Sequence, residues 1–328
     1  MLFRSLRRHY AGAHIVGVVK PYVAGVLEGG DWFDQLLFAN GGKWSQSEFA
    51  VAWHLRKLKI ELALLFPNSF RSAFTAFLGR CRRRVGYARY GRGPLLTDRI
   101  QPLRDSRGRL QPSPILDAYN VLAERVGVRP TRRMELFTTP RDEAAADTVW
   151  RQYRLSSFPR VVCLNPGAAF GAAKHWPADY FVTLARDLAN RAGCAVLVLC
   201  GPAERELAGQ IAASARHPAV HSLADSPLSL GLTKACVRRA DLLVTTDSGP
   251  RHFAAAFNRP VITLFGPTHI AWTETYYPLA VHLQKKVECG PCQLRTCPLD
   301  HRCMKQLTPA EVYQTAASVL ARERHDVA

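Results

Sequence analysis

The chain has 328 residues, of which 48% are hydrophobic and 21% charged, a composition typical of a globular protein with room for two domains. No apolar run is long enough to span a bilayer, and Lys20 and Pro21 interrupt the apolar stretch 13–27, which excludes a signal-peptide core. The formal net charge is +18, and residues 1–110 hold 19 Lys and Arg against 7 Asp and Glu.

Such a basic half attracts nucleic acid, anionic lipid headgroups or phosphorylated sugars. The sequence has no zinc-finger spacing, basic zipper or RNP-like aromatic motif, so no nucleic-acid partner is predicted. We expect a cytoplasmic protein whose ligands are anionic.

Short β-branched runs alternate with longer helical stretches, which favours parallel sheets with crossover helices. In the first half, the pattern predicts strands at His14–Val19 and Leu62–Phe66. A Pro-, Gly- and Arg-rich stretch at 91–114 then breaks the alternation. We therefore expect two α/β domains, 1–150 and 151–328, with ligands held in a cleft at the carboxyl ends of the strands.

The second half resumes the alternation with segments of clearer periodicity. Strands are predicted at Arg160–Asn165, Ala195–Cys200, Leu242–Thr245 and Pro260–Phe265. Helices are predicted at Ala178–Ala192, Ser248–Phe257 and Pro309–Arg322.

The first motif, at residues 165–177, directly follows a predicted strand. Its glycines and alanines permit close approach of the backbone to a ligand, and Lys174 adds a positive charge. A P-loop is excluded because two alanines separate the second glycine from the lysine and His175 follows it. An ordinary strand–helix turn with a surface lysine is the alternative.

The second motif, at residues 245–252, lies between a predicted strand and a predicted helix. Asp247 or Ser248 is suited to cap the helix, and amides near Gly249, with His252, would favour a phosphate. A plain helix cap without a ligand is the alternative. Because both motifs follow strands of one predicted sheet, together they predict a diphosphate pocket.

Two further segments carry weaker signals. Glu204 follows a third strand and is a candidate for ribose hydroxyls, or simply a solvated glutamate at a helix start. Five scattered cysteines are expected to be buried hydrophobes, namely Cys81, Cys163, Cys194, Cys200 and Cys236. The remaining four leave open a metal or cluster site, a redox disulfide or packed thiols; they are Cys289, Cys292, Cys297 and Cys303.

Together these segments resemble glycosyltransferase family nine, the ADP-heptose:lipopolysaccharide heptosyltransferases, and within it the heptosyltransferase II branch. The resemblance covers nearly the whole chain. It rests on the residues Leu164–Pro177, Thr246–His252, Phe265–Thr268 and the Cys289–Cys303 cluster, and on Leu65–Ser72 and Arg83–Tyr87 in the first half.

The resemblance implies a GT-B architecture of two Rossmann-like parallel-sheet domains facing across a cleft. Domain 151–328 would bind ADP-heptose, and domain 1–150 would bind the lipopolysaccharide core acceptor on lipid A at the inner face of the inner membrane. Transfer would invert the anomeric centre without a metal ion or another cofactor. The implied donor-binding residues are Lys174, Asp247, Ser248, Gly249, His252, Glu204 and Leu228, and the implied acceptor-binding residues are Arg71 and Arg83.

The start of the chain departs from the family pattern. The family opens with a strand and a Gly-Asp loop whose aspartate is the implied general base, whereas Leu2–Tyr10 already resembles the end of the following helix. Asp31 and Asp34 lie too late in the chain to replace that aspartate. We therefore identify no catalytic residue and expect a gap in the N-terminal sheet with exposed apolar surface.

Three functions remain open at this point. The first is heptosyl transfer, with the true start of the protein upstream. The second is binding of a nucleotide sugar without transfer, and the third is transfer of another nucleotide sugar. A dinucleotide-dependent oxidoreductase is disfavoured because no Gly-x-Gly-x-x-Gly follows a predicted strand.

Overall fold

The computed structural model describes residues 2–39, 46–167 and 170–322. It divides the chain into two compact units: unit 1, Met1–Arg133 with Ala271–Thr275, and unit 2, Met134–Ile270 with Tyr276–Ala328. The division lies at Arg133 and Met134 rather than at the expected residue 150. The reason is that the helix after the division packs on a helix of unit 2, where Glu143 pairs with Arg239 at 2.7 Å.

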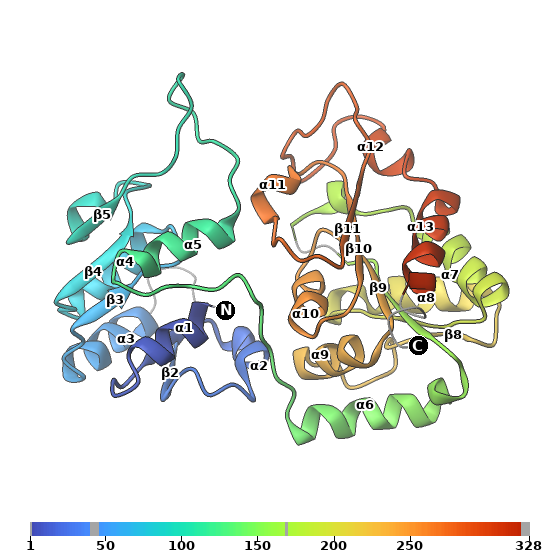
Figure 1. Cartoon of the computed structure of the whole chain (residues 1–328), viewed down its shortest axis with the longest axis horizontal. Coiled ribbons are helices and arrows are strands. Elements are labelled where there is room, and N and C mark those ends of the chain that lie inside the picture. Colours follow the sequence, from blue (N-terminus) through green and yellow to red (C-terminus); the bar gives the residue numbers. More distant parts are fainter. Residues whose placement is uncertain (1, 40–45, 168–169, 323–328) are drawn as a thin grey trace. The chain divides into compact units, whose positions relative to one another are not determined.

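Unit 1 contains short strands that belong to two separate parallel sheets (Figure 1). Its strands are β1 (Val16–Val19), β2 (Gln35–Phe38), β3 (Leu62–Leu64), β4 (Arg83–Tyr87) and β5 (Asp98–Ile100). Its helices are α1 (Leu2–His9), α2 (Ala24–Leu27), α3 (Gln46–Lys57), α4 (Phe70–Leu78) and α5 (Ile115–Glu124).

The sheets have the orders β1-β2 and β3-β4-β5, and no described strand joins them. The expected gap in the N-terminal sheet is therefore observed, and Val18 and Phe38 are among the exposed apolar side chains beside it. The core is divided as well. One cluster gathers Val51, Leu55 and Leu65 among others, and a second joins α1 and α5 through Leu2 and Leu122.

Unit 2 is built around one larger parallel sheet. Its strands are β6 (Val161–Asn165), β7 (Ala195–Val198), β8 (Val220–Ser222), β9 (Leu242–Thr246), β10 (Val261–Phe265) and β11 (Ala280–Gln284). Its helices are α6 (Pro140–Gln152), α7 (Ala178–Ala192), α8 (Arg205–Ala215), α9 (Leu230–Arg239), α10 (Pro250–Ala256), α12 (Arg302–Lys305) and α13 (Pro309–Arg322). The short helix α11 (Ile270–Thr273) spans the point where the chain passes between the units.

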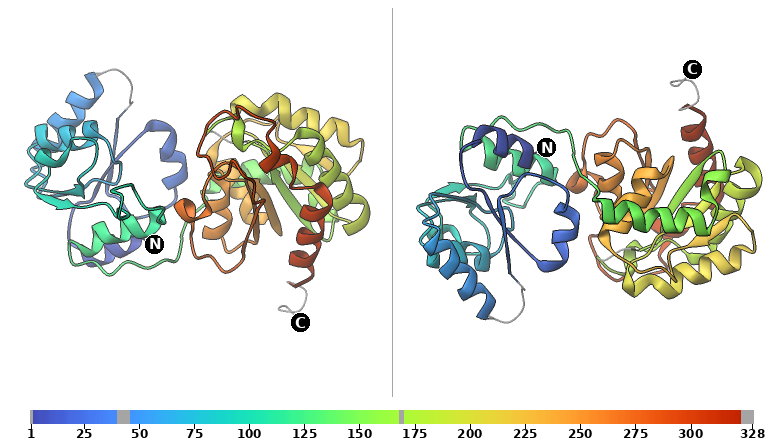
Figure 2. Two further views of the ribbon diagram at one scale, coloured as in Figure 1. Left: turned by 90° about the horizontal axis from the view of Figure 1, so that it is seen from above. Right: turned by 90° about the horizontal axis from the view of Figure 1, so that it is seen from below.

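The unit 2 sheet has the order β11-β10-β9-β6-β7-β8, so its first strand, β6, lies in the middle. Helix α7 contacts both α8 and α13, and α9 contacts both α6 and α10. In Figure 2, α6 runs along unit 2. Every residue of β6, β9 and β10 is buried, as expected for continuous apolar runs covered on both faces. This core fixes the carboxyl edge of the sheet, where both sequence motifs lie.

All six strands predicted from the sequence are present, with bounds that differ by up to two residues at an end. The predicted helices Ala178–Ala192 and Pro309–Arg322 match α7 and α13. The five scattered cysteines are buried, as expected. In the part of the chain that the structure describes, no helix combines the length and the apolar character needed to cross a membrane.

Candidate functional site

The two motifs meet at the carboxyl edge of the unit 2 sheet. β6 and β9 are hydrogen-bonded neighbours in a parallel register that pairs Asn165 with Thr245, so the segments that follow them start side by side. β10 lies on the other side of β9 and brings Thr268 to the same edge. Ala168 and Ala169 of the first motif lie outside the described residues.

A buried ion cluster forms where these segments meet, and we call it the Asp247 cluster. Lys174 Nζ lies 2.5 Å from Asp247 Oδ2 and 3.1 Å from the Asp247 carbonyl oxygen. Arg251 Nη1 lies 3.3 Å from Asp247 Oδ1, and the Thr268 hydroxyl donates to Oδ2 at 2.9 Å. All four side chains are buried. The alternative for the first motif, an ordinary strand–helix turn with a surface lysine, is therefore excluded.

The electrostatics of the Asp247 cluster favour an anionic ligand. Burial alone would raise the pKa of Asp247, but the hydrogen bond and charge of Lys174, with Thr268 and Arg251, more than offset it and hold the pKa below its usual value. The carboxylate is thus ionised at neutral pH and faces two cations. The contacts within the cluster thus set two cations against one carboxylate, at an edge where buried charges interact strongly.

A second network fixes the loop backbones around the cluster. Asn165 Nδ2 donates to the hydroxyls of Thr245 and Ser248, both at 3.0 Å. The Thr246 hydroxyl donates to the Gly167 carbonyl at 2.7 Å, which ties the first motif to the end of β9. Apart from its chain neighbours, no residue comes within 4 Å of the place that a Cβ on Gly249 would take, so a ligand could approach the backbone at that point.

His252 lies in the first turn of α10, next to Arg251. Burial, with the neighbouring Arg251 charge, lowers the pKa of His252 to about 4. The imidazole is therefore neutral at physiological pH and offers one donor and one acceptor. Its part in donor binding stays a prediction, and as a neutral ring it adds no charge to attract an anion.

Glu204 and Leu228 follow the two strands on the far side of β6. The Glu204 carboxylate accepts from the Gly201 amide at 2.8 Å, and a Cβ on Gly167 would meet Glu204 Oε1 at 2.7 Å. Glu204 thus lies directly against the first motif, and a side chain at position 167 would displace its carboxylate. Leu228 lies partly buried in the loop between β8 and α9.

The two candidate acceptor residues lie at opposite edges of the β3-β4-β5 sheet. Arg71 is in the first turn of α4, which follows the carboxyl end of β3, and its Nη1 lies 3.2 Å from Glu48 Oε1. Arg83 is the first residue of β4 and makes two hydrogen bonds to Asp98, at 3.2 and 2.9 Å. The structure therefore does not bring Arg71 and Arg83 together.

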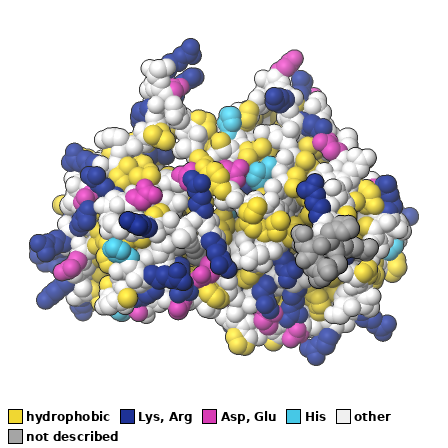
Figure 3. All heavy atoms as spheres, in the orientation of Figure 1, with side chains coloured by type: hydrophobic (Ala, Val, Ile, Leu, Met, Phe, Trp, Pro, Cys, Tyr) yellow, Lys and Arg dark blue, Asp and Glu magenta, His cyan; other side chains and the backbone are white. Residues whose placement is uncertain are grey.

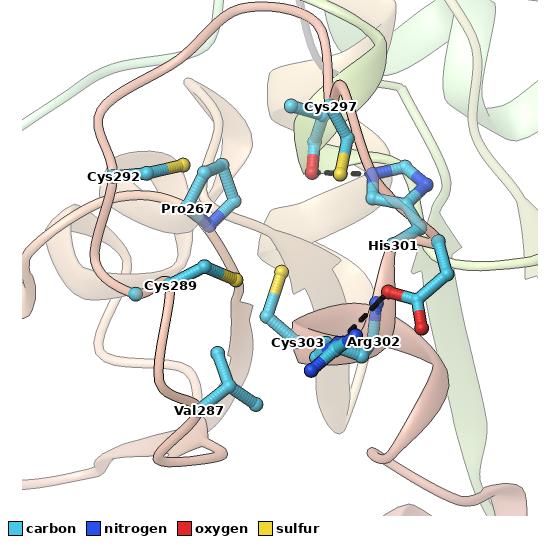
Figure 4. Close-up of a pocket in the computed structure, with 11 residues that line it drawn as sticks. Pro267, Val287, Cys289, Cys292, Cys297, His301, Arg302 and Cys303 are labelled. Atoms are coloured by element: carbon cyan, nitrogen blue, oxygen red, sulfur yellow. Dashed lines mark hydrogen bonds and ion pairs between the residues drawn. The ribbon is translucent and has the colours of Figure 1, made fainter.

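The four late cysteines surround one small cavity of about 20 Å³ in unit 2 (Figure 4). Burial raises the pKa of Cys303, and the other three cysteines raise it further, so the thiols lie within electrostatic reach of one another. All four are free thiols. Among the described residues, no three His, Cys, Asp or Glu side chains are arranged to hold a metal ion.

The cysteine-rich segment also packs on the first motif. The Ala173 amide donates to the Arg295 carbonyl at 2.9 Å, and His301 Nε2 lies 2.8 Å from the Ala173 carbonyl. Lys174 and Arg295 both lie over the Phe170 ring, at 4.7 and 5.4 Å from its centre. The segment thus braces the loop that carries Lys174.

Sequence reasoning missed three residues that complete the site. Asn165 and Arg251 stood within the two motifs, but their roles depend on hydrogen bonds across β6 and β9. Thr268 follows β10, and its contact with Asp247 depends on the strand order. A polar residue at, or up to three residues after, the carboxyl end of a predicted strand was the signal that could have found Asn165 and Thr268.

With this geometry established, the comparisons with known proteins identify the family. The family model described as glycosyltransferase family 9 (heptosyltransferase) matches residues 49–302. The chain is 34% identical over 167 residues to lipooligosaccharide heptosyltransferase 2 of Campylobacter jejuni, covering 49% of this chain and 51% of that protein. It is 29% identical over 227 residues to lipopolysaccharide heptosyltransferase 2 of Escherichia coli, covering 65% and 62%. The chain thus spans about half to two thirds of these relatives.

Solved structures confirm the expected fold class. The E. coli ADP-heptose lipopolysaccharide heptosyltransferase II matches with a TM-score of 0.78 at 24% identity, covering 98% of this chain and 94% of that one. E. coli heptosyltransferase WaaC with ADP-2-deoxy-2-fluoro heptose matches with a TM-score of 0.66 at 18% identity, covering 97% and 93%. At these identities the likeness shows the fold, an α/β GT-B fold with two parallel-sheet domains.

Proposed function

The chain belongs to glycosyltransferase family 9, and we propose that it transfers heptose from ADP-L-glycero-D-manno-heptose to the inner core of lipopolysaccharide. The observation that carries the proposal is the Asp247 cluster, in which one carboxylate faces two buried cations at the carboxyl edge of the sheet. Two buried cations beside a single carboxylate suit the diphosphate of a nucleotide sugar.

The donor would be held by the residues that surround this cluster. Lys174 and Arg251 would bind the diphosphate, and Ser248, Gly249 and His252 would contact the phosphates and the heptose. Glu204 would accept hydrogen bonds from the ribose hydroxyls, and Leu228 would contact the adenine. Both lie in loops at the carboxyl edge, beside β7 and β8.

The proposed reaction is a direct displacement with inversion. The oxygen of an acceptor hydroxyl would form a bond to the anomeric carbon of the heptose, while the bond from that carbon to the ADP oxygen breaks. Negative charge would develop on the departing diphosphate, where Lys174 and Arg251 would stabilise it more strongly than in the ground state. The hydroxyl proton would pass to a base or to solvent.

Unit 1 would bind the acceptor, with Arg71 offered to its phosphates or acidic sugars. Arg71 lies at the carboxyl edge of β3, the edge at which parallel sheets bind ligands, whereas Arg83 is engaged by Asp98 at the other edge. We include Arg83 only as a more distant contact. The acceptor is carried on lipid A, so the protein would work at the inner face of the inner membrane.

A specific observation favours a second candidate, binding of the nucleotide sugar without transfer. Asp31 and Asp34 are both held by α1, where Asp31 pairs with Arg4 and Asp34 with Arg7. Hydrogen bonds from these arginines lower the pKa of each aspartate, which weakens it as a base. Neither residue is therefore suited to accept the acceptor proton.

One experiment distinguishes heptosyl transfer from binding without transfer. ADP-heptose affinity is measured by calorimetry, and ADP release is then followed with a heptose-acceptor lipopolysaccharide. We expect Lys174→Ala to weaken donor binding about 10- to 100-fold through loss of a charge-assisted contact. The fold should survive because Arg251 and Thr268 still pair Asp247.

The matched control is Lys285→Ala, which removes a half-exposed lysine paired with Glu311 elsewhere in unit 2. Unchanged ADP-heptose affinity in Lys174→Ala would remove that lysine from the site. Tight donor binding with no ADP release on addition of acceptor would contradict transfer and support binding of the nucleotide sugar without transfer.

A further inference from the structure

Helices α3 and α4 of unit 1 pack together and expose a set of aromatic side chains. Phe70, Phe74 and Phe77 recur at helical spacing and form a stripe along α4. Phe49 and Trp53 are one turn apart on α3. Phe49, Trp53, Phe70 and Phe77 are 54%, 55%, 44% and 47% exposed, which is unusual for four large aromatic rings on adjacent helices.

Exposed basic residues lie on or directly after α3 and α4, and we call these two helices together with Arg56, Lys57, Lys59 and Arg80 the aromatic-basic face. Residues 46–84 contain eight Lys and Arg, namely Arg56, Lys57, Lys59, Arg71, Arg80, Arg82, Arg83 and Arg84, against Glu48 and Glu61. Glu48 is buried and paired with Arg71. In Figure 3, Lys and Arg side chains gather along the left edge of unit 1. The surface is thus apolar and positively charged.

Two contacts join the charges to the rings. Lys57 Nζ lies 3.4 Å from the centre of the Trp53 ring, and the Arg84 guanidinium lies 5.6 Å from the Phe77 ring. Such cation–π pairs hold a long basic side chain alongside an exposed aromatic ring. The stem of exposed Lys57 therefore lies along the Trp53 ring while its charge remains available to an external anion. The Arg84 guanidinium is instead held by the carbonyls of Leu95 and Cys81.

We propose that the aromatic-basic face docks the protein on an anionic phospholipid bilayer. Aromatic rings favour the boundary between headgroups and acyl chains, and lysines and arginines beside them are attracted to anionic headgroups. The proposal rests on the proposed function in one respect: docking would bring the protein to an acceptor that is linked to lipid and lies in a membrane. The docking itself depends only on the surface and can be measured without donor or acceptor.

A bilayer fits this face better than a second copy of the chain. A two-fold contact through the stripes would bring two rims of like charge together, which opposes association. The central part of most protein interfaces is depleted of lysine, whereas Lys57 lies directly on Trp53 here. A bilayer supplies both the apolar layer for the rings and the negative charge for the rim.

The test is sedimentation of the full chain with vesicles of phosphatidylcholine alone and of phosphatidylcholine with phosphatidylglycerol, at low and high salt. We expect binding to the anionic vesicles, weakened by salt. Trp53→Ala/Phe77→Ala should reduce the partition coefficient about tenfold or more, because it removes two interfacial rings. Lys57→Glu/Arg80→Glu should reduce it at least as much, since each charge near the surface contributes about fivefold.

Two control variants match these changes elsewhere on unit 1. Tyr22→Ala removes an exposed aromatic ring that also has a lysine over it, Lys20 at 5.9 Å. Lys20→Glu/Arg107→Glu makes the same change in net charge through residues outside α3 and α4. Both should bind anionic vesicles within about twofold of the wild type, since exposed substitutions away from the face change little.

Equal vesicle binding by all the variants, or none by the wild type, would overturn the proposal. So would a wild-type dimer in light scattering that Trp53→Ala/Phe77→Ala converts to a monomer, because the rings would then pair with a second copy. ADP-heptose affinity, measured by calorimetry in the same variants, separates the two proposals. Vesicle binding lost with donor affinity retained supports the docking face, and donor affinity absent from the wild type would count against the proposed function alone.

Discussion

The sheets of the two units differ in continuity. In unit 2 the strand that comes first in the chain, β6, lies between β7 and β9 and joins three strands on one side to two on the other. In unit 1 the described strands form one pair, β1-β2, and one separate sheet of three, β3-β4-β5. No described strand joins the pair to the sheet of three. All residues of β6 are buried, whereas each residue of β3 is only partly buried.

This difference shows what a central strand contributes to such a domain. β6 supplies hydrogen-bond partners to two neighbours, and apolar side chains to both layers of helices. It also delivers the first motif to a place beside β9, where Lys174 reaches Asp247. Unit 1 has two separate cores, and the buried cation at the carboxyl ends of its β3 and β4, Arg92, is held by the Tyr87 carbonyl and the Asn68 amide oxygen rather than by a carboxylate. Stability and site construction are therefore coupled through β6.

The largest expected effect is on the Asp247 cluster. Asp247→Asn would leave Lys174 and Arg251 buried without their carboxylate, and we expect unit 2 to lose about 3–5 kcal/mol of stability. Asp98→Asn is the matched change in unit 1, where Arg83 is half-exposed, and should cost at most about 1 kcal/mol. Native-state hydrogen exchange, followed by mass spectrometry on peptides from each unit, measures both.

The pH dependence of the stability lost in Asp247→Asn gives a further check on the Asp247 cluster. The folded-state pKa of Asp247 is depressed, so its contribution is fully present above the unfolded value near 4 and is lost as pH falls through the folded value. The difference between wild type and Asp247→Asn should narrow below about pH 4. Equal losses in Asp247→Asn and Asp98→Asn at pH 7 would contradict the contrast between the units.

A smaller effect is expected in the apolar cores. Leu164→Ala in β6 removes a fully buried side chain and should cost unit 2 about 3 kcal/mol. Leu64→Ala in β3 removes a partly buried one and should cost unit 1 about half as much. The same exchange experiment compares them, and the control is Val18→Ala, whose side chain is exposed. A larger loss for Leu64→Ala would mean that the divided sheet is as tightly packed as the continuous one.

Much of unit 2 could be predicted from the sequence because its strands are apolar runs and its helices α7 and α13 have strong periodicity. The strands that escaped prediction are β2, β4, β5, β8 and β11. β4 begins with two arginines and β8 has three residues, so neither has a local pattern that separates it from a loop. Their formation depends on pairing with distant strands, which single-sequence patterns do not report.

The site was predictable in part for the same reason. Lys174 and Asp247 each follow a predicted strand, so their meeting at one edge could be expected. The second cation, Arg251, could not be assigned because its direction depends on contacts with Phe265 and His282. The separation of Arg71 and Arg83 was missed because a strand residue and a helix residue close in sequence lie at opposite sheet edges.

The smallest expected effect concerns His252 and tests whether unit 2 alone carries a pH-sensitive site. The folded-state pKa is lowered to about 4 from an unfolded value near 6.5, so the unfolded state binds more protons between these values and stability falls as pH drops. Allowing for partial exposure, we expect about 2 kcal/mol to be lost from pH 7 to pH 4.

His252→Gln stays neutral over this range, so unit 2 should lose less stability on acidification than the wild type does. His54→Gln, at an exposed position of α3, is the matched change in unit 1 and should leave the stability of unit 1 at pH 7 within about 0.5 kcal/mol of the wild type. An unaltered slope in His252→Gln would mean that the imidazole is hydrated and accepts a proton freely. The first turn of α10 would then be open to solvent. Lys174 and Arg251 would in that case bind an anion beside a hydrated His252 rather than beside a buried one.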